Sequence, residues 1–511
     1  MAHRNGLRAS ALPLALLAPM AWAPAAPAQE TGGCVRVLGY EWSGESQSMD
    51  PASMHSGDDA YHVFAVYNRL VDVDDNFNVI PELATEWSVS EDGLTWTFRL
   101  RDGVTFHSGK PFTAADVVYT FQRLLDPATG SGAAAVMEFL DPEGIAAPDP
   151  LTVTFTTPAP VVELPVLISN KFTNIVPEGA TSEELRLQGD GTGPFMQEEF
   201  TPNAPVRRLV ANPDYWEDGL PLAPCLEITV AQEAMTGVAA MLGGQVDLML
   251  NVDPSVIPAL QGNPAVTLLE TGASNSMTVS MWTDTPPFDD PRVREAMKLV
   301  VDRQAMVDTV LLGYGQPAAD NPVPLASPAS FTTEAPAADP ERARQLLAEA
   351  GYPDGLEVDL YTAEGVPGMV RMAQVYAEMA RAGGIDVNVV VTPAESYWDD
   401  VWLNQPLLTS AWSMRPPGEG LAVAYVQTAK WPETHWNRPD YDALLSEANT
   451  TVDEAARLDL YKQAGEMLAT EGGAIIPMFV HQVLALRAGC TGYTPLAQNF
   501  NLNFERLTCE G

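Results

Sequence analysis

The stretch from Pro81 to Pro127, PELATEWSVSEDGLTWTFRLRDGVTFHSGKPFTAADVVYTFQRLLDP, carries the information that decides the fold. Between residues 94 and 100, apolar and polar side chains alternate, which is the period-two pattern of a strand with one buried face. Turn residues at 90–93, 102–103 and 108–111 divide the run into two β-hairpins. Thr113 and Asp116 then form the start signal of a helix. The passage therefore predicts two hairpins followed by a helix.

Three later passages carry equally clear local signals. They are GTGPF at 191–195 with ANPDYW at 211–216, PPFDDPRVREA at 286–296 with VDR at 301–303, and DPERARQLLAEAGYP at 339–353. The Asp-Pro pairs at 290–291 and 339–340 each predict an N-cap and a first helical residue, and Gly351 predicts a helix stop. The Pro-rich residues 316–338 between them predict a long surface loop.

The order and the residue motifs of these four passages resemble those of the family 5 extracellular solute-binding proteins. These proteins deliver dipeptides, oligopeptides, nickel chelates and related solutes to ABC importers. The resemblance implies an α/β protein with the two-lobed periplasmic binding protein-like fold, of the class II or cluster C type. Lobe I would comprise residues 29–278 with a C-terminal return at 479–511, and would carry an extra subdomain at about 50–190. Lobe II would comprise residues 279–478.

The function that this resemblance implies is capture of a peptide-like or small acidic solute between the lobes and its delivery to ABC permease subunits. We expect no catalysis, because the chain has neither an H-E-x-x-H motif nor a G-x-S-x-G motif. We also expect no cofactor, no resident metal and a monomer. Two alternatives stay open: a receptor for nickel or another metal chelate, and a secreted hydrolase on a two-domain scaffold.

The first 28 residues have the pattern of a secretion signal. A basic start is followed by an apolar run from Ala11 to Met20, too short to span a bilayer, and by Ala26-Pro27-Ala28 at the cleavage positions. Thr31 to Cys34 lacks the apolar residue of a lipoprotein cleavage box, so we expect a periplasmic protein without stable membrane insertion.

The chain is strongly acidic, with a formal net charge of −40. This balance disfavours nucleic acid as a partner, because its phosphates would be repelled. The acidity fits two readings: an adaptation to solubility or salt, or a field that gathers cationic solutes.

Four cysteines in an exported chain predict two disulfides, with three possible connectivities. Cys34 and Cys225 each precede an apolar strand pattern. If those strands lie side by side in parallel, their starts are neighbours, which favours Cys34–Cys225. Cys490 and Cys509 would then clasp the C-terminal loop.

The best candidate wall of a binding cleft is an aromatic stretch between residues 396 and 417. Trp412 falls where peptide receptors of the resembled family stack an aromatic ring on the ligand. Arg415 stands where those receptors carry an aspartate that pairs with a peptide ammonium. Since a guanidinium pairs with a carboxylate or phosphate instead, an acidic solute or an anionic metal chelate is favoured. The alternative is a surface pair of Arg415 with Glu419. Trp398 is a further ligand candidate, although its spacing also suits helical burial.

Lobe I would supply residues beyond the end of its first strand, where ligands collect in α/β folds. Tyr40 and Glu41 stand at that end, and Met54 and His55 follow in the next loop. Asn275, near the crossover between lobes, could donate a hydrogen bond from the hinge. These residues complete the predicted ligand contacts.

Overall fold

The computed structural model describes residues 33–40, 48–54, 57–75, 77–197, 201, 204–231, 233–497 and 502–510. Its helices are α1 (Gly57–Val66), α2 (Ala114–Leu125), α3 (Ala133–Val136), α4 (Leu164–Leu167), α5 (Ser182–Gln188), α6 (Ala234–Leu242), α7 (Ile257–Leu260), α8 (Pro291–Leu299), α9 (Arg303–Val310), α10 (Pro340–Glu349), α11 (Met369–Ala382), α12 (Ala394–Ser396), α13 (Pro417–Ala422), α14 (Pro439–Thr450) and α15 (Glu454–Glu471). Single helical turns of other types are η1 (Pro51–Ser53), η2 (Pro142–Gly144), η3 (Pro254–Val256) and η4 (Tyr397–Val401).

The strands are β1 (Val35–Tyr40), β2 (Val71–Val73), β3 (Val79–Pro81), β4 (Ala84–Val89), β5 (Thr95–Leu100), β6 (Ile145–Asp149), β7 (Thr152–Thr156), β8 (Phe195–Gln197), β9 (Val206–Ala211), β10 (Cys225–Ala231), β11 (Leu248–Met249), β12 (Val266–Met281), β13 (Gly315–Pro317), β14 (Leu356–Ala363), β15 (Ile385–Thr392), β16 (Leu407–Ser413), β17 (Ala474–Arg487), β18 (Cys490–Thr491) and β19 (Thr508–Cys509). The largest sheet has the order β15-β14-β16-β12-β17-β11-β1-β10-β9-β8, with β13 paired to β17.

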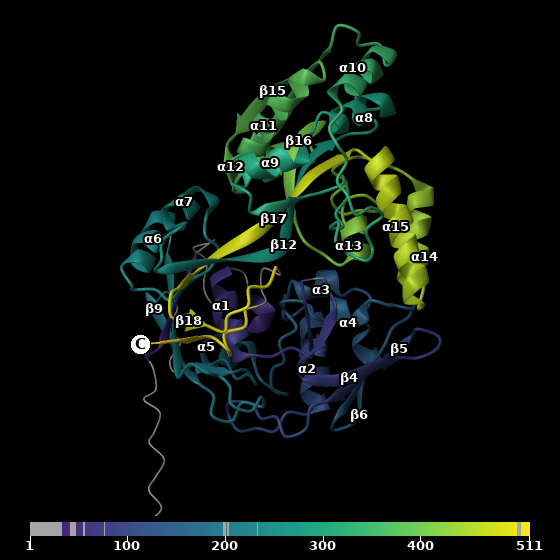
Figure 1. The fold of residues 1–511 in the computed structure, drawn as a ribbon. Helices are drawn as coiled ribbons and strands as arrows, with labels where there is room; N and C mark the ends of the chain where they lie inside the picture. The colour runs from purple at the N-terminus through teal and green to yellow at the C-terminus, as the bar shows by residue number, and fades with distance from the viewer. Residues whose placement is uncertain are drawn as a thin grey trace, which may run out of the picture.

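Two long antiparallel strands, β12 and β17, join the two halves of this sheet (Figure 1). One half holds β11, β1, β10, β9 and β8, and we call the part of the protein built on it lobe I. The other half holds β16, β14 and β15, and forms lobe II with helices α8 to α15. The pairing of β12 with β17 shifts register at three places between Glu270 and Val279. Such irregularities bend and twist a ladder, and here they fall where the chain passes between the lobes.

The lobe I half of the sheet is mixed, with a parallel centre, antiparallel β9 and β8 at its edge, and helices on both faces. β1 pairs in parallel with β10 and with β11. Val35 and Val37 face α1 in one buried cluster, whereas Leu38 faces α6 and α7 in another. Since successive residues of a strand point to opposite faces, this alternation places a helical layer on each side of the sheet.

Lobe II repeats the arrangement with its own two layers. Helices α8 to α11 cover one face of β14, β15 and β16 and bury the side chains of Met277 and Met478 beneath them. Helices α13 to α15 pack on the other side against β17, where Ile476 and Phe479 are buried, whereas the second face of β14 and β15 is largely exposed. Asp290 and Asp339 cap α8 and α10 as their sequence signals predict, each accepting a backbone N–H. Gly351 follows α10 with φ 100°, the left-handed conformation of a helix stop.

The opening passage folds largely as predicted. β4 and β5 form the first hairpin, and Phe98 is completely buried. The second hairpin is short: Thr105 and Pro111 form an isolated antiparallel bridge, flanked by hydrogen bonds from the Phe106 N–H to the Lys110 carbonyl at 2.8 Å and from the Phe112 N–H to the Val104 carbonyl at 2.9 Å. Asp116 accepts a hydrogen bond from the Thr113 N–H at 2.8 Å, so α2 begins at the predicted place.

The Pro-rich segment at 316–338 is not simply a surface loop. It begins with β13, and Asn321 is completely buried. Asp320 is also buried and pairs with Arg303 at 2.5 Å. The segment is therefore anchored inside lobe II by polar contacts that its composition did not reveal.

Both expected disulfides are present. Cys34–Cys225 joins the starts of β1 and β10, which are parallel neighbours, and Cys490–Cys509 joins β18 to β19. Among the described residues no cysteine is left unpaired. No helix in the described part of the chain has the length and apolar character to cross a bilayer.

Candidate functional site

A cavity of about 460 Å³ lies where lobe I, lobe II and the two connecting strands meet. Lobe I contributes residues 251–254, which follow the carboxyl end of β11, and Ala234 at the start of α6 after β10. Ligands in α/β folds collect beyond the carboxyl ends of parallel strands. The cavity therefore occupies the place where this fold class binds small molecules.

The wall from lobe I is held in a defined shape. Asn251 has φ 51°, a left-handed conformation that Asn tolerates better than most residues. Asp253 then accepts the Ser255 N–H at 2.8 Å and so caps η3. These local contacts fix the backbone that faces the cavity.

The floor of the cavity belongs to the connecting strands. Asn275 and Met277 come from β12, residues 480–483 come from β17, and Ala411 comes from β16. Asn275 pairs in the ladder with Ser413 on one side and Val480 on the other. Any molecule in the cavity would thus contact the segments that link the two lobes.

The opposite wall comes from lobe II. Leu311 and Tyr314 follow α9, and residues 365–367 form the turn between β14 and α11. This wall is mainly apolar, and the described lining contains no lysine or arginine. An apolar chamber with a few amide and imidazole groups is typical of a small-molecule site.

A second, much smaller hollow lies on the other face of β16. Its lining includes Ser276, Trp412 and Arg415. Ser276 pairs with Trp412 in the ladder, whereas Met277 pairs with Ala411. Because neighbouring residues of a strand point to opposite faces, the hollow and the cavity lie on opposite sides of the same strands.

Glu433 lies beneath the aromatic side of this hollow and is completely buried. Its carboxylate accepts hydrogen bonds from the Trp402 indole at 2.5 Å, the Trp412 indole at 3.0 Å, the Ser410 hydroxyl at 3.0 Å and the Ser280 hydroxyl at 3.2 Å. Burial raises the pKa of the Glu433 carboxyl. The four donors compensate for that burial and fix the two indole rings in orientation.

The tryptophans themselves form a connected group. The ring centroids of Trp412 and Trp431 are 5.7 Å apart, those of Trp402 and Trp412 are 6.2 Å apart, and those of Trp398 and Trp402 are 5.5 Å apart. Tilted rings at these separations pack favourably. Trp398 is 41% exposed at the outer end of the group and lines neither hollow.

Arg415 lies over the Trp412 ring, with its guanidinium carbon 5.4 Å from the ring centroid. Its Nε donates to the Glu419 carboxylate at 2.7 Å. The surface pair that the sequence left open as an alternative is therefore formed, and Arg415 also borders the small hollow.

The other predicted ligand residues fall in several places. Asn275 lines the cavity. Met54 does not: it is 3% exposed and packs in the core between α1 and the sheet, because the turn of η1 directs it inward. Tyr40 ends β1, but its side chain, like Glu41 and His55, lies outside the described residues.

Sequence reasoning missed five polar residues of the cavity, namely Asn251, Asp253, Tyr314, His481 and Gln482. Asn251 could have been found, since it follows a strand that ends beside β1. His481 and Gln482 lie just after the predicted boundary between lobe II, which ends at 478, and the C-terminal return, which begins at 479. Tyr314 follows an ordinary helix and carried no such signal.

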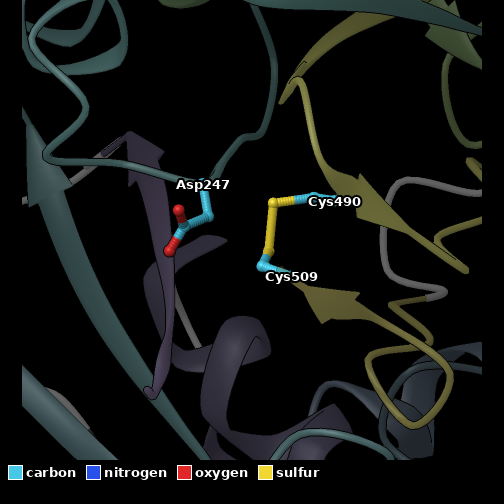
Figure 2. Close-up of side chains that lie close together, drawn as sticks. All are labelled: Asp247, Cys490 and Cys509. Atoms are coloured by element: carbon cyan, nitrogen blue, oxygen red, sulfur yellow. A yellow bond between two sulfur atoms is a disulfide. The ribbon is translucent and has the colours of Figure 1, made fainter. Parts of the chain in front are cut away.

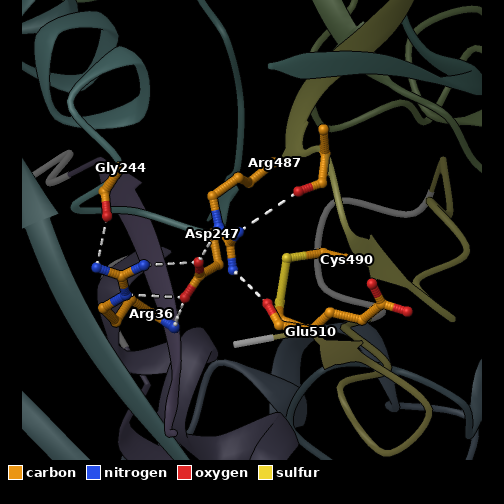
Figure 3. The surroundings of a disulfide bond; sticks show 8 residues. Arg36, Gly244, Asp247, Arg487, Cys490 and Glu510 are labelled. Atoms are coloured by element: carbon orange, nitrogen blue, oxygen red, sulfur yellow. Dashed lines mark hydrogen bonds and ion pairs between the residues drawn. A yellow bond between two sulfur atoms is a disulfide. The ribbon is translucent and has the colours of Figure 1, made fainter. Parts of the chain in front are cut away.

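One group of possible metal-ligating side chains occurs in the described chain: Asp247, Cys490 and Cys509 (Figure 2). Its two sulfur atoms are bonded to each other, and thiolates rather than disulfides ligate metals. Asp247 is engaged by Arg36 at 2.8 Å and by Arg487 at 2.6 Å (Figure 3). The arrangement ties the C-terminal return to β1 and does not fit a metal site.

The fold and the interlobe cavity together define a two-lobed solute-binding protein. The family model described as bacterial extracellular solute-binding proteins, family 5 middle, matches residues 78–431. The chain belongs to this family.

Two curated relatives and one solved structure are similar to this chain over most of its length. Heme-binding protein A of Haemophilus influenzae is 31% identical over 78% of this chain and 79% of its own length. Di/tripeptide-binding protein 2 of Pseudomonas aeruginosa is 30% identical over 82% of this chain and 85% of its own length. The structure of HbpA2 from Haemophilus parasuis has a TM-score of 0.80 at 25% identity, covering 94% of this chain and 100% of that one.

Proposed function

We propose that the protein captures a small peptide-like solute in the interlobe cavity, presents it to the permease of an ABC importer and releases it unaltered. The observation that carries this proposal is a cavity of about 460 Å³ bounded by both lobes and by the strands that connect them. A ligand drives closure only if it contacts both lobes in the closed state. The name of the Pseudomonas aeruginosa relative, which states di- and tripeptides, supports the class of solute, whereas the name of the Haemophilus influenzae relative states haem.

The residue boundaries that we propose for the lobes follow from the same strands. Lobe I is assigned residues 29–278 and 479–511, with a subdomain at about 50–190, and lobe II is assigned residues 279–478. The crossings of β12 and β17 between the lobes fall close to these boundaries and support them. We further propose that residues 1–28 are a signal peptide and that the mature protein acts as a monomer in the periplasm.

The test is to identify the solute. Protein purified without denaturation should release a small molecule that mass spectrometry detects. After that molecule is removed, adding it back should raise the melting temperature, because a ligand that binds only the folded state stabilises it by about 2.7 kcal/mol at a hundredfold excess over Kd. A chemically changed product after incubation would contradict the receptor function and favour a hydrolase.

A separate proposal, in which the solute binds on the Trp412 side of β16 rather than in the interlobe cavity, concerns an acidic group on the solute. Arg415 borders the Trp412 hollow and shares its guanidinium with Glu419, so a ligand carboxylate would have to compete with that side chain. We expect Arg415→Ala to weaken binding of the identified solute about tenfold or more, by the loss of a charge-assisted hydrogen bond. Calorimetry measures the change, with Arg342→Ala on the exposed face of α10 as the control. Unchanged affinity would remove Arg415 from the site.

A further inference from the structure

Phe77 stands at the tip of the β2–β3 hairpin of lobe I in a backbone conformation that large side chains rarely adopt. Its φ is 61°, in the left-handed region where hairpin turns normally carry glycine. The turn imposes this conformation: the Phe77 N–H donates to the Asp74 carbonyl at 3.0 Å, and the Asp74 carboxylate accepts the Asn78 N–H at 2.9 Å. A bulky residue persists in such a place only when contacts outside the turn hold it there.

Those contacts lie in the other lobe. The half-buried side chain of Phe77 packs on the apolar cluster that α13, α14 and α15 form with residues 318–329. The same cluster includes Met414, Val423 and Tyr425, which line the Trp412 hollow. The tip of a lobe I hairpin therefore reaches the side of lobe II that carries Trp412.

The hairpin that carries Phe77 is anchored where the chain crosses between the lobes. Asp75 Oδ1 accepts the Ala497 N–H at 2.6 Å, and Asp75 Oδ2 accepts the Gly272 N–H of β12 at 3.4 Å. Gly272 falls within the first register shift of the β12–β17 ladder, between residues 270 and 273. Phe77 is thus held in a fixed position next to the segment about which the lobes would move.

The neighbouring β4–β5 turn meets the same helices of lobe II. A Cβ atom on Gly93 would lie 3.5 Å from Cγ2 of Val452, which stands between α14 and α15. The turn brings no side chain of its own to this contact, and Val452 stays 45% exposed. Phe77 therefore supplies this side of the lobe interface with an apolar surface that the β4–β5 turn lacks.

We propose that Phe77 is a closing contact, which brings the two lobes together on the Trp412 side of β16 with or without solute. Burial of its aromatic side chain against the lobe II cluster favours this closed form. A contact that favours the closed form raises the affinity of any solute that this form encloses, because the solute then supplies less of the free energy of closure. Phe77 would thus set how much of the receptor is closed before solute arrives. The contact presupposes the hinge motion of the proposed receptor function.

The experiment measures the separation of the lobes in solute-free protein. Spin labels on Asp102→Cys in lobe I and Glu447→Cys in lobe II, both at exposed positions, report their distance by double electron–electron resonance. The four native cysteines are paired in disulfides, so the labels attach at the added positions. In Phe77→Gly the ratio of closed to open molecules should fall about tenfold, because glycine suits the turn but leaves the lobe II cluster uncovered.

Three further variants separate the closing contact from a local structural role. Phe77→Asn also tolerates the left-handed conformation without an apolar ring, so it should open the protein as Phe77→Gly does. Phe77→Leu keeps an apolar side chain against the cluster and should retain most of the closed population. Leu312→Gly is the matched control: it relaxes another left-handed residue, with φ 56°, whose side chain is 41% exposed, and it should match the wild type.

The outcomes decide the role of Phe77 without knowledge of the solute. Identical distance distributions for the wild type and for both Phe77→Gly and Phe77→Asn overturn the closing contact and leave the receptor function standing. Equal opening in Phe77→Gly and Leu312→Gly overturns it too, because the relaxed backbone would then be the cause. The receptor function is decided separately, by the solute that mass spectrometry finds in the purified protein.

Discussion

Glu433 shows how one buried side chain can organise a whole aromatic surface. The sequence drew attention to the tryptophans between residues 398 and 412, but nothing near them in the chain pointed to an acid more than twenty residues later. Its four donors come from β12, from β16 and from the residue that follows η4. Such a contact depends on tertiary structure and has no local pattern.

We expect Glu433→Met to destabilise the protein strongly. The change leaves two indole N–H groups and the Ser280 hydroxyl without their acceptor, whereas the Ser410 hydroxyl keeps the Thr278 hydroxyl at 2.8 Å. Each unsatisfied buried group costs about 1–3 kcal/mol. Glu433→Gln keeps one carbonyl oxygen and should cost less. Urea unfolding gives both values, and Glu447→Met on the exposed side of α14 serves as the control. Equal stability of Glu433→Met and the wild type would show that the network adds nothing.

In the candidate site, too, residues with a local sequence signal could be predicted, and residues that depend on distant partners could not. Asn275 could be placed at the cavity because it stands in a predicted crossover, and Trp412 and Arg415 could be grouped because they are close in sequence. His481 could not be placed at the cavity, since its hydrogen-bond partner Glu270 is 211 residues away. Met54 follows the short turn η1 and is buried in the core of lobe I, a position that its sequence neighbours did not reveal.

At the scale of elements, local rules were sufficient where the signal was local. The caps at Asp290 and Asp339 and the hairpin of β4 with β5 follow directly from residue types and spacing. The joining of β12 and β17 across the lobes could be anticipated only through the family resemblance. The burial of Asp320 and Asn321 in a Pro-rich segment was missed, because composition does not report polar groups that are satisfied internally.

The two disulfides should contribute unequally to stability. Cys34–Cys225 closes a sequence separation of 191 residues and Cys490–Cys509 one of 19. On the chain-entropy account, the first restricts the unfolded chain more, with upper values of about 5 and about 3 kcal/mol. Urea unfolding of Cys34→Ser/Cys225→Ser and of Cys490→Ser/Cys509→Ser compares them directly. A larger loss from the second pair would show that folded-state contacts of the C-terminal return dominate.

Lys298 in α8 gives a prediction about pH. Burial lowers its pKa to about 8, while its amino group donates to the Ala469 carbonyl at 2.7 Å and the Gly472 carbonyl at 2.9 Å. Between pH 8 and the ordinary value of 10.5, the unfolded chain keeps a proton that the folded chain has released. The free energy of unfolding therefore rises with pH in this window, by at most about 1.4 kcal/mol per unit.

The comparison with Lys298→Met isolates this effect. The variant should lose that part of the slope when urea unfolding is measured at several pH values between 8 and 9.5. Lys462→Met changes a partly exposed lysine of α15 and should keep the wild-type slope. Parallel pH profiles for all three proteins would rule out the contribution of Lys298.

At the scale of the whole molecule, the lobes also meet beside the start of α4. Glu163, which precedes α4 in lobe I, lies against Gly418 and Tyr461 in lobe II: a Cβ on Gly418 would be 3.0 Å from Glu163 Oε2 and 2.6 Å from the Tyr461 oxygen. Burial raises the pKa of the Glu163 carboxyl. A side chain at position 418 would meet Tyr461 and Asn449 within lobe II as well as Glu163 across the interface.

We expect Gly418→Ala to hold the lobes apart. The added methyl group would press on Tyr461 within lobe II and on Glu163 across the interface. Small-angle scattering should then show a larger radius of gyration without solute and a smaller compaction when solute is added. Gly420→Ala is the matched control, since its Cβ would meet only ordinary contacts of 3.7 Å or more. Identical scattering curves for the two variants would mean that this contact does not limit the spacing of the lobes.

The placement of the sulfur bridges has a mechanical consequence. Both tether chain segments within the half built around β1, and neither reaches into the half built around β14. In an oxidising compartment the disulfides would thus stiffen lobe I. The motion of lobe II relative to lobe I would still depend on non-covalent contacts alone. Reducing agents should therefore loosen lobe I without changing the angle through which lobe II moves.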